Sequence, residues 1–458
     1  MNQSINRVLS GMRPTGRLHI GHYFGALQNW VRLQSDPTYD CFFFVADWHA
    51  LTSDYADTSA IAENSLQITI DFLASGLDPA KSTIFLQSLV PEHAELHLLL
   101  SMITPLGWLE RIPTYKEQLD NIQNKDLHTY GFLGYPTLQT ADIVIYSPQP
   151  QSDGAGSTPP TGAAPASSDG PASASSVGAA LGRPSLLVPV GEDQVSHVEF
   201  SRELVRKFNY EMGEFYIEPS IEKRENKEYL KMLESVVDDW KMAGGLLALA
   251  GLSPTMTPKN LGFVVRFFAK QIGYENFLEK IGTARKFVKF QPILTEPQAL
   301  LTPTPRIPGL DGRKMSKSYG NAITLSETDE DIRKKTKVMV TDPARKRRTD
   351  PGNPDVCPVF DWHKLFSTPE RDPGRLDWVR QGCTTAGIGC IECKSAMAEN
   401  LIKWIEPVRA RRIDYEQHPK RVMEILDAGS AQAQKSARQT MQRVRESIFH
   451  WPQKRAAL

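Results

Sequence analysis

The chain has 458 residues, of which 40% are hydrophobic and 23% charged, so it can bury a large core and exceeds the size of one ordinary domain. Its 53 basic and 53 acidic side chains cancel at pH 7. This balance excludes attraction of a polyanion by the net charge of the whole molecule, and such a partner would need a local basic patch. Neither a cleavable leader nor an apolar run long enough to span a bilayer is visible, so we expect a cytoplasmic protein without membrane contact.

Alternating strands and helices are predicted over residues 1–148. Buried strands are expected at 7–10, 41–46 and 83–86, and helices at about 58–75 and 92–103. This order predicts an α/β fold with a Rossmann-type parallel sheet that is covered by helices. Ligands of such sheets bind beyond the carboxyl ends of the strands.

Two insertions are predicted to interrupt the middle of the chain. Residues 149–184 consist almost entirely of Gly, Ala, Ser, Thr and Pro, which predicts a disordered loop. A strand at 186–190 and a helix from 193 to about 209 place 185–219 in the sheet domain again. Residues 220–290 are predicted to form a helical insertion of unknown purpose.

The remainder divides into two parts. Residues 291–325 begin as a Pro-rich stretch and lead into a loop that contains Gly and Lys. Residues 326–458 are predicted to form a mostly helical domain rich in Arg and Lys.

The first run that indicates chemistry is His19-Ile20-Gly21-His22, which is predicted to open a helix directly after the first strand. A helix N-terminus offers unpaired N–H groups and partial positive charge, and two imidazoles at i and i+3 share one face. Gly21 leaves room for a close approach of a base or ribose. The run is therefore suited to a triphosphate, and the alternative is two surface histidines at a helix start.

The second run is Lys314-Met315-Ser316-Lys317-Ser318, far along the chain on a glycine-flanked loop. Its two lysines could close over phosphates and neutralise the charge that develops as pyrophosphate leaves. Alone, such a pentapeptide would usually be a solvated loop.

In this order the two runs resemble the HIGH and KMSKS signatures of the class I aminoacyl-tRNA synthetases. Four further runs look like the bacterial type of tryptophanyl-tRNA synthetase: 10–16, 46–52, 135–143 and 188–194. The resemblance covers roughly 7–148, 185–210 and 292–450. It implies a Rossmann catalytic domain, a C-terminal α-helical tRNA-binding domain that reads the anticodon, and a homodimer. The implied co-substrates are ATP with Mg²⁺, and the implied partners are tryptophan and tRNA(Trp).

The resemblance also implies an ATP site built from both signatures and from the segment after the strand at 186–190. Its residues would be Arg13, Pro14, Thr15, Gly21, His22, Gly191, Glu192, Asp193, Ile307, Lys314, Met315, Ser316, Lys317 and Ser318. The expected catalytic groups are His19, His22, Lys116, Lys314 and Lys317. Lys116 matches a family lysine that reaches the triphosphate, and it could equally be a solvated helix lysine.

Selection of the amino acid would depend on Asp142. A carboxylate only accepts hydrogen bonds and the indole N–H only donates, so the two can pair, whereas phenylalanine would leave a buried carboxylate unpaired. Tyr135, Gln139 and Asp142 share one helical face and would form the pocket together with Gln194. The alternative for Asp142 is a structural or capping residue.

Four of the five cysteines form the pattern C-x25-C-x6-C-x2-C: Cys357, Cys383, Cys390 and Cys393. Four thiolates suit a tetrahedral zinc or an iron–sulfur cluster. A subset of tryptophanyl-tRNA synthetases that carry a [4Fe-4S] cluster resembles this pattern, although the first gap is slightly longer here. We expect the cluster, with zinc and then free thiols as alternatives, and a structural role beside the anticodon.

Basic tracts at 333–337 and 345–348 are either solvated helix faces or phosphate contacts for tRNA. Trp362, His363 and Trp378 lie near the cysteines and either stack on anticodon bases or pack in the core.

Three other functions compete with tryptophan activation. A tyrosyl-tRNA synthetase shares the Gln-x2-Asp helix, but it typically has a tyrosine near the first strand, where this chain has Leu9. A catalytically inactive, synthetase-like RNA-binding protein is possible if the 149–184 insertion folds over the pocket. A small-molecule adenylyltransferase would leave the second signature unexplained.

Overall fold

The computed structural model describes residues 5–112, 115, 128–148, 185–217, 258–272, 274–301 and 307–449, together with a few single residues between 220 and 231 and after 449. The predicted disordered insertion at 149–184 lies outside the described residues, as does much of the predicted insertion at 220–290.

A five-stranded parallel sheet of order β3-β2-β1-β4-β7 forms the centre of the molecule. Its strands are β1 (Asn6–Met12), β2 (Tyr39–Val45), β3 (Ser82–Leu86), β4 (Leu186–Val190) and β7 (Pro297–Leu301). The chain first builds outward from β1 to β3 and then returns to the other side of β1 with β4. The sheet therefore has its topological switch point between β1 and β4, where ligands of open α/β sheets bind.

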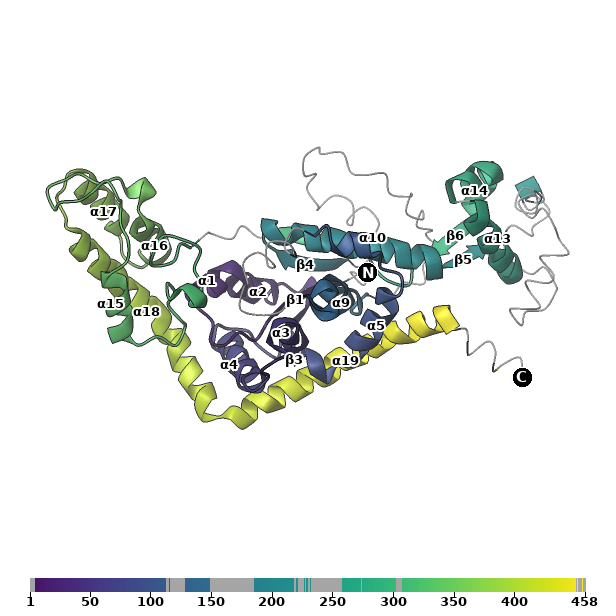
Figure 1. Cartoon of the computed structure of the whole chain (residues 1–458), viewed down its shortest axis with the longest axis horizontal. Coiled ribbons are helices and arrows are strands. Elements are labelled where there is room, and N and C mark those ends of the chain that lie inside the picture. The colour runs from purple at the N-terminus through teal and green to yellow at the C-terminus, as the bar shows by residue number, and fades with distance from the viewer. Residues whose placement is uncertain are drawn as a thin grey trace.

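Helices cover both faces of the sheet, as the apolar runs predicted. Successive residues of a strand point to opposite faces, so Val8 and Phe43 pack in one core, whereas Leu9 and Phe44 pack in the other. The first core also contains residues of α2 (Gln28–Leu33) and α4 (Ile61–Ala74), and the second contains residues of α5 (Glu92–Ser101), α9 (Tyr135–Val144) and α10 (Val195–Met212). Figure 1 shows α10 and α4 on different sides of the strands.

Three predictions about strands and helices need correction. The Pro-rich stretch at 292–308 contains β7, the edge strand beside β4. A separate antiparallel pair, β5 (Glu214–Ile217) and β6 (Val288–Gln291), flanks the predicted helical insertion, whose described helices are α13 (Pro258–Ile272) and α14 (Tyr274–Ile281). The sequence also gave no sign of α3 (Asp47–Asp54), which follows β2 directly. The other short helices of the sheet region are α6 (Leu106–Leu109) and α8 (Tyr130–Leu133).

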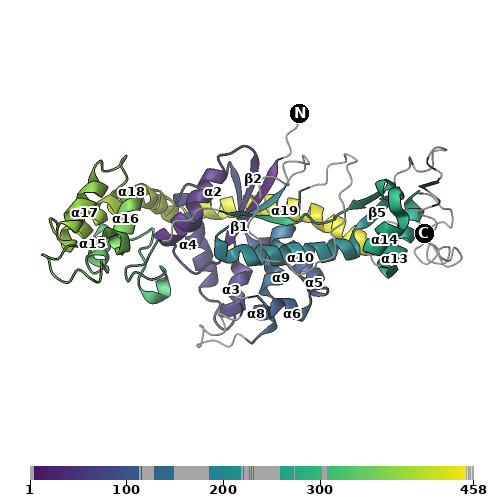
Figure 2. The same cartoon turned by 90° about the horizontal axis from the view of Figure 1, so that it is seen from above.

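The C-terminal part is helical, as predicted, and consists of α15 (Asp329–Lys337), α16 (Pro358–Phe366), α17 (Arg375–Thr384), α18 (Cys390–Gln417) and α19 (Pro419–Phe449). Helices α15 to α17 gather around the start of α18, which then runs back to the sheet (Figures 1 and 2). The chain turns at His418, and α19 passes along the sheet. No described helix has the length and apolarity that a bilayer crossing requires.

Helix α19 covers the edge strand β3. A Cβ atom at Gly429 would lie 1.9 Å from the carbonyl oxygen of Ile84, so only glycine permits this approach. Ser430 Oγ accepts a hydrogen bond from the Leu86 N–H at 3.3 Å. The helix thus supplies to the exposed strand edge the packing that a further strand would otherwise give.

Candidate active site

The first signature lies at the switch point of the sheet. The loop leaves the carboxyl end of β1, and Gly16 takes a φ of +89°, a conformation that favours glycine. His19 caps the short helix α1 (Ile20–His22), and the chain continues through a π-helical turn (Tyr23–Leu27) into α2. The prediction that the run opens a helix is confirmed.

His19 and His22 lie on one face of this helix start, with ring centroids 3.7 Å apart. The His22 Nδ1 accepts a hydrogen bond from the His19 N–H at 3.2 Å. Burial lowers the pKa of His19 to about 4, and burial followed by the proximity of His19 and Lys317 lowers the pKa of His22 to about 3. Both rings are therefore neutral at pH 7 and can bind phosphate oxygens as hydrogen-bond donors, without a full charge.

The second signature packs directly on the first. Lys317 Nζ donates hydrogen bonds to the carbonyl oxygens of Thr15 and, at 3.0 Å, of Arg17. A Cβ at Gly21 would lie 3.4 Å from the Met315 sulfur. The segment that follows pairs with the first signature as well, because the Ile20 N–H donates to the Ile323 carbonyl at 3.0 Å. The two runs, distant in sequence, form one site, as their order predicted.

The other predicted ATP-site residues differ in their burial and in whether the structure describes their side chains. Gly191 follows the end of β4, and Glu192 begins a short 3-10 turn (Glu192–Gln194) with an exposed side chain. Ile307 is buried in the same core as Met315, whereas Pro14 is buried in the signature loop and Lys314 is exposed. Ser316 donates its N–H to Asn321 at 2.7 Å. Lys116 and the side chains of Asp193 and Ser318 lie outside what the structure describes.

Helix α9 brings the predicted amino-acid pocket next to the nucleotide loop. Tyr135, Gln139 and Asp142 all belong to it, as the spacing predicted. Burial lowers the pKa of Arg13, whereas Asp54 and Tyr135 act in the opposite direction. Arg13 also donates to Ser53 Oγ on α3 at 2.6 Å. Gln194 begins α10 as its N-cap.

Asp142 is 1% exposed and accepts hydrogen bonds from three side chains. The donors are His49 Nε2 at 2.7 Å, His93 Nδ1 at 2.6 Å and Gln87 Nε2 at 2.8 and 2.9 Å. Because a carboxylate only accepts, His93 carries its proton on Nδ1, and its Nε2 accepts from the Tyr146 hydroxyl at 2.8 Å. Burial raises the pKa of Asp142, but the hydrogen bonds from both histidines outweigh it and lower the value to about 2. Asp142 is thus a carboxylate at neutral pH.

His49, Gln87 and His93 were not among the predicted site residues. They come from α3, from the turn after β3 and from α5. His49 and Gln87 follow the carboxyl ends of β2 and β3, the place where ligand contacts are expected, so strand position was a usable signal. His93 gave no such sign.

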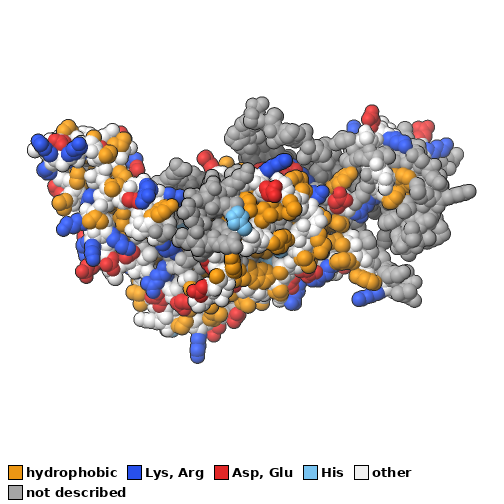
Figure 3. Space-filling view, viewed as in Figure 1, with side chains coloured by type: hydrophobic (Ala, Val, Ile, Leu, Met, Phe, Trp, Pro, Cys, Tyr) orange, Lys and Arg blue, Asp and Glu red, His pale blue; other side chains and the backbone are white. Residues whose placement is uncertain are grey.

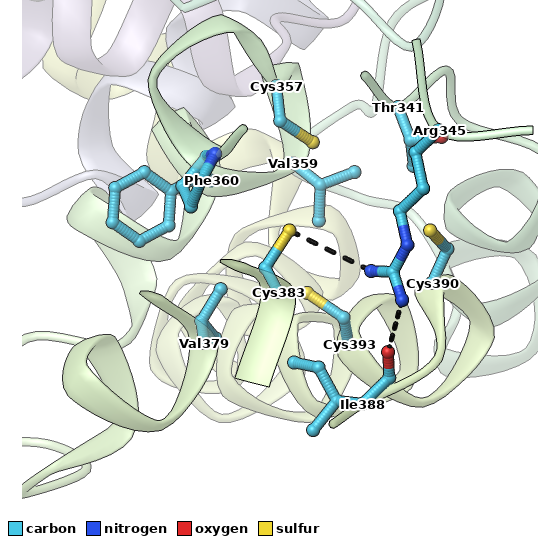
Figure 4. Close-up of a pocket in the computed structure, with 11 residues that line it drawn as sticks. Thr341, Arg345, Cys357, Val359, Phe360, Val379, Cys383, Ile388, Cys390 and Cys393 are labelled. Atoms are coloured by element: carbon cyan, nitrogen blue, oxygen red, sulfur yellow. Dashed lines mark hydrogen bonds between the residues drawn. The ribbon is translucent and has the colours of Figure 1, made fainter. Parts of the chain in front are cut away.

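The four clustered cysteines line one pocket among the C-terminal helices, together with Arg345, Val359, Val379 and Ile388 (Figure 4). Cys357 precedes α16, Cys383 lies on α17, and Cys390 and Cys393 lie in the first turn of α18. Burial and then the neighbouring Cys357, Cys383 and Cys390 raise the pKa of Cys393 to about 12. The described residues contain no group of three or more His, Cys, Asp or Glu side chains placed to hold a single metal ion.

The structure answers two questions that the sequence left open for this region. Arg345, predicted among the basic phosphate contacts, is buried in the cysteine pocket, where it donates to Cys383 Sγ at 3.7 Å and to the Ile388 carbonyl at 2.7 Å. Trp362 and His363 are fully buried, and Trp362 donates to the Pro308 carbonyl at 2.9 Å. Core packing, the alternative, holds for both. Trp378 is half-buried under Arg375, whose guanidinium carbon lies 4.7 Å from the ring centroid.

Comparison with known proteins assigns the family. The family model "tRNA synthetases class I (W and Y)" matches residues 1–234 and 274–406. A tryptophan–tRNA ligase of Ralstonia nicotianae is 44% identical over 453 residues, which cover 96% of this chain and 98% of the relative. The chain belongs to the tryptophanyl-tRNA synthetases. The internal stretch of this synthetase that the family model leaves unmatched, 235–273, falls inside the segment predicted to be an insertion.

Further relatives agree with this assignment. A tryptophan–tRNA ligase of Thermotoga maritima is 37% identical to this synthetase and covers 96% of it and 98% of its own length. The crystal structure of the Campylobacter jejuni tryptophanyl-tRNA synthetase, complexed with ADP and tryptophan, matches with a TM-score of 0.63 at 26% identity and covers 96% of this synthetase and 99% of that chain. The family inferred from the two signatures and the Rossmann-type fold class are therefore confirmed. The roles of single residues stay predictions.

Proposed function

We propose that this synthetase is a tryptophan–tRNA ligase that adenylates tryptophan with Mg²⁺-bound ATP and then transfers the tryptophanyl group to the 3′ end of tRNA(Trp). The observation that carries the proposal is the contact between the two signatures at the switch point, with the Asp142 helix beside them. In the first step the tryptophan carboxylate attacks the α-phosphorus, and pyrophosphate leaves. In the second step a hydroxyl of the terminal tRNA ribose attacks the activated carbonyl, and AMP leaves.

The side chains supply positioning and charge stabilisation. The triphosphate would lie against the helix start at His19 and His22, where the neutral imidazole rings can donate hydrogen bonds to phosphate oxygens. Lys317 uses two of its three ammonium N–H groups to donate to carbonyl oxygens of the first signature, and the third can donate to a phosphate oxygen when ATP binds. Lys314, which is exposed, is free to approach from the same loop. Neither step needs a protein nucleophile.

Recognition of the indole by Asp142 requires one donor to move. A carboxylate has about four acceptor positions, and the four bonds from His49, Gln87 and His93 occupy them all. His93 is fully buried and fixed by Tyr146, and Gln87 is also fully buried. His49 has the most exposed side chain of the three, at 10%. We therefore expect His49 to yield its position on Asp142 to the indole N–H.

An amino-acid-dependent ATP–pyrophosphate exchange assay tests the function. Tryptophan should support exchange and tyrosine should not, and the purified protein should then charge tRNA(Trp). Exchange with tyrosine alone would instead identify a tyrosyl-tRNA synthetase. Complete absence of exchange with every amino acid would indicate an inactive RNA-binding relative.

The cysteine pocket supports a resident [4Fe-4S] cluster. The four clustered cysteines line one cavity, and this is the observation that supports the proposal. A single zinc holds its ligands at about 2.3 Å from one point, whereas a multi-iron cluster needs its four cysteines spread around a larger body. Cys357, Cys383, Cys390 and Cys393 would hold the cluster, and its contribution would be structural, since it ties α16, α17 and α18 together.

Replacement of Cys390 by serine should abolish the cluster. We expect about four iron and four sulfide per chain in the unaltered protein and loss of most of both in Cys390→Ser. Charging of tRNA should fall at least tenfold and by more than pyrophosphate exchange, because the pocket is formed by the C-terminal helices that are expected to bind tRNA. The matched control is Cys41→Ser, a buried cysteine in the sheet core. One zinc per chain in the unaltered protein would contradict the cluster.

Exposed apolar side chains support a homodimer. They belong to α5, α6, α8 and their neighbours: Leu51, Leu89, Leu98, Met102, Leu106 and Tyr130, with exposed fractions from 39% to 70%. Figure 3 shows hydrophobic side chains gathered over the middle of the face on which α5 and α9 lie. Monomeric proteins rarely leave so much contiguous apolar surface in water.

Sedimentation should give twice the chain mass of 51.2 kDa. The double variant Leu98→Glu/Met102→Glu should sediment as a monomer, because two charges would be buried in the interface. Met423→Glu, an exposed apolar residue of α19, should leave the mass unchanged. A monomeric unaltered protein at micromolar concentration would exclude the dimer.

A further inference from the structure

Arg412 lies near the end of α18 and is almost fully buried, with 1% of its surface exposed. Its Nη1 donates to Asp71 Oδ1 on α4, and its Nη2 donates to Gln67 and, at 3.0 Å, to Glu416. A guanidinium of the C-terminal part is thus inserted into the sheet domain, where both of its Nη atoms donate to acceptors.

Asp71 is fully buried and divides its two oxygens between distant parts of the chain. Oδ1 accepts from Arg412, and Oδ2 accepts from the backbone N–H of Leu18 at 2.6 Å. Leu18 directly precedes His19, the first residue of the signature. One carboxylate therefore joins α18 to the backbone of the nucleotide loop.

The same short segment holds the second signature. The Arg17 carbonyl accepts from Lys317 at 3.0 Å, and the Leu18 carbonyl accepts from the Leu325 N–H at 2.8 Å. The Arg17 guanidinium also reaches Glu416 of α18 at 3.5 Å. Residues 17–18 are therefore held on one side by α18, through Asp71 and Glu416, and bind Lys317 of the second signature on the other side.

Stability alone gives a weak reason for this pair. A buried ion pair contributes little net free energy, because desolvation offsets the attraction, and well-packed apolar residues are often equally stable. What such a pair does supply is fixed geometry: neither charge can leave its partner, and the Leu18 N–H has an obligatory acceptor.

We propose that Arg412 is a positioning residue for adenylation: through Asp71 it fixes the Arg17–Leu18 backbone in the position that lets Lys317 and the two histidines contact ATP together. The ATP site is then complete only when α18 is docked on α4. This inference rests on the proposed function and adds to it a specific dependence of ATP binding on the C-terminal helix.

The test measures exchange kinetics in the full-length protein. Arg412→Gln retains a donor for Asp71 but loses the charge and one of the paired contacts. We expect the KM for ATP to rise about tenfold while the KM for tryptophan stays within about twofold. Residues 17–18 belong to the nucleotide loop and bind Lys317, whereas the predicted tryptophan pocket lies on α9. Arg411→Gln is the matched control, since Arg411 also bonds α4, at the Ala74 carbonyl (2.7 Å), without contacting Asp71. Its KM for ATP should be that of the unaltered protein.

Arg412→Gln leaves a buried Asp71 charge and could unfold the protein, so the double variant Asp71→Asn/Arg412→Gln is measured beside it. This variant has no unpaired charge and still offers an acceptor to Leu18, so its thermal unfolding should approach that of the unaltered protein while its KM for ATP stays raised. A normal KM for ATP in the folded double variant would overturn the proposal, as would a parallel rise in both KM values. Absence of exchange in the unaltered protein would instead count against the proposed function.

Discussion

Asp142→Asn should reduce kcat/KM for tryptophan by about 10³-fold, equivalent to about 4 kcal/mol of lost transition-state stabilisation. The amide has one acceptor oxygen and a donor NH₂ group, so it cannot accept from His93, Gln87 and the indole at once, and its NH₂ group opposes at least one of these donors. The loss should appear with tryptophan as the varied substrate, and the KM for ATP should change less than about threefold.

The variant requires a check of folding, because buried donors left without an acceptor cost about 1–3 kcal/mol of stability each. Glu92→Gln is the matched control: Glu92 is a buried carboxyl on α5, one residue before His93, and it binds Arg438 and Gln434 on α19 without touching Asp142. Unchanged kcat/KM in a folded Asp142→Asn variant would mean that the carboxylate is purely structural, the alternative raised by its complete burial.

The pH profile should separate these two roles further. With a pKa of about 2, Asp142 does not titrate between pH 5 and 9, so kcat/KM for tryptophan should show no step from this group there. Its folded pKa lies below the ordinary value of 3.8, so its contribution to stability is present above about pH 4 and is lost as the pH falls toward 2.

Lys317→Ala should lower the rate of pyrophosphate exchange by about 10²–10³-fold, the usual loss when one preorganised donor to a developing charge is removed. Most of the loss should fall on kcat, because the lysine acts when pyrophosphate departs, and the KM for ATP should change less. Burial lowers the Lys317 pKa below its usual value of 10.5, while Asp71 acts in the opposite direction.

Lys364→Ala is the control for this variant, because Lys364 is an exposed lysine of α16 that pairs with Asp361. Single-turnover measurement of adenylate formation distinguishes a slower chemical step from slower product release. A Lys317→Ala variant with normal kcat would leave the charge stabilisation to Lys314 and the helix start.

The meeting of the two signatures was implied by the resemblance to the class I synthetases, and the predicted strand order placed the first signature at a carboxyl edge. The long apolar strands around Phe43 and Ile84 could be predicted equally well from the sequence. The edge strand at Pro297–Leu301 was not, since proline and glutamine at its start are poor strand residues, and its place is fixed by pairing with Leu186–Val190.

The sequence did not reveal those parts of the site that depend on contacts between residues far apart in the chain. Asp142 was identifiable from its helix, but the donors that occupy it come from three other parts of the chain and share no pattern with it. Arg345 looked like the rest of its basic tract and is nevertheless buried beside Cys383. Nothing in the sequences of α4 and α18 singled out Asp71 or Arg412. Only the packing of the two helices shows that Asp71 links Arg412 to the backbone of the nucleotide loop.

The approach of Gly429 to the backbone of Ile84 has a consequence for biosynthesis. The ribosome makes α19 after every strand of the sheet, so β3 leaves the tunnel long before its covering helix exists. Until then its backbone can pair with another nascent chain. The catalytic half of the molecule therefore depends for its solubility on a segment that is translated last among the described elements.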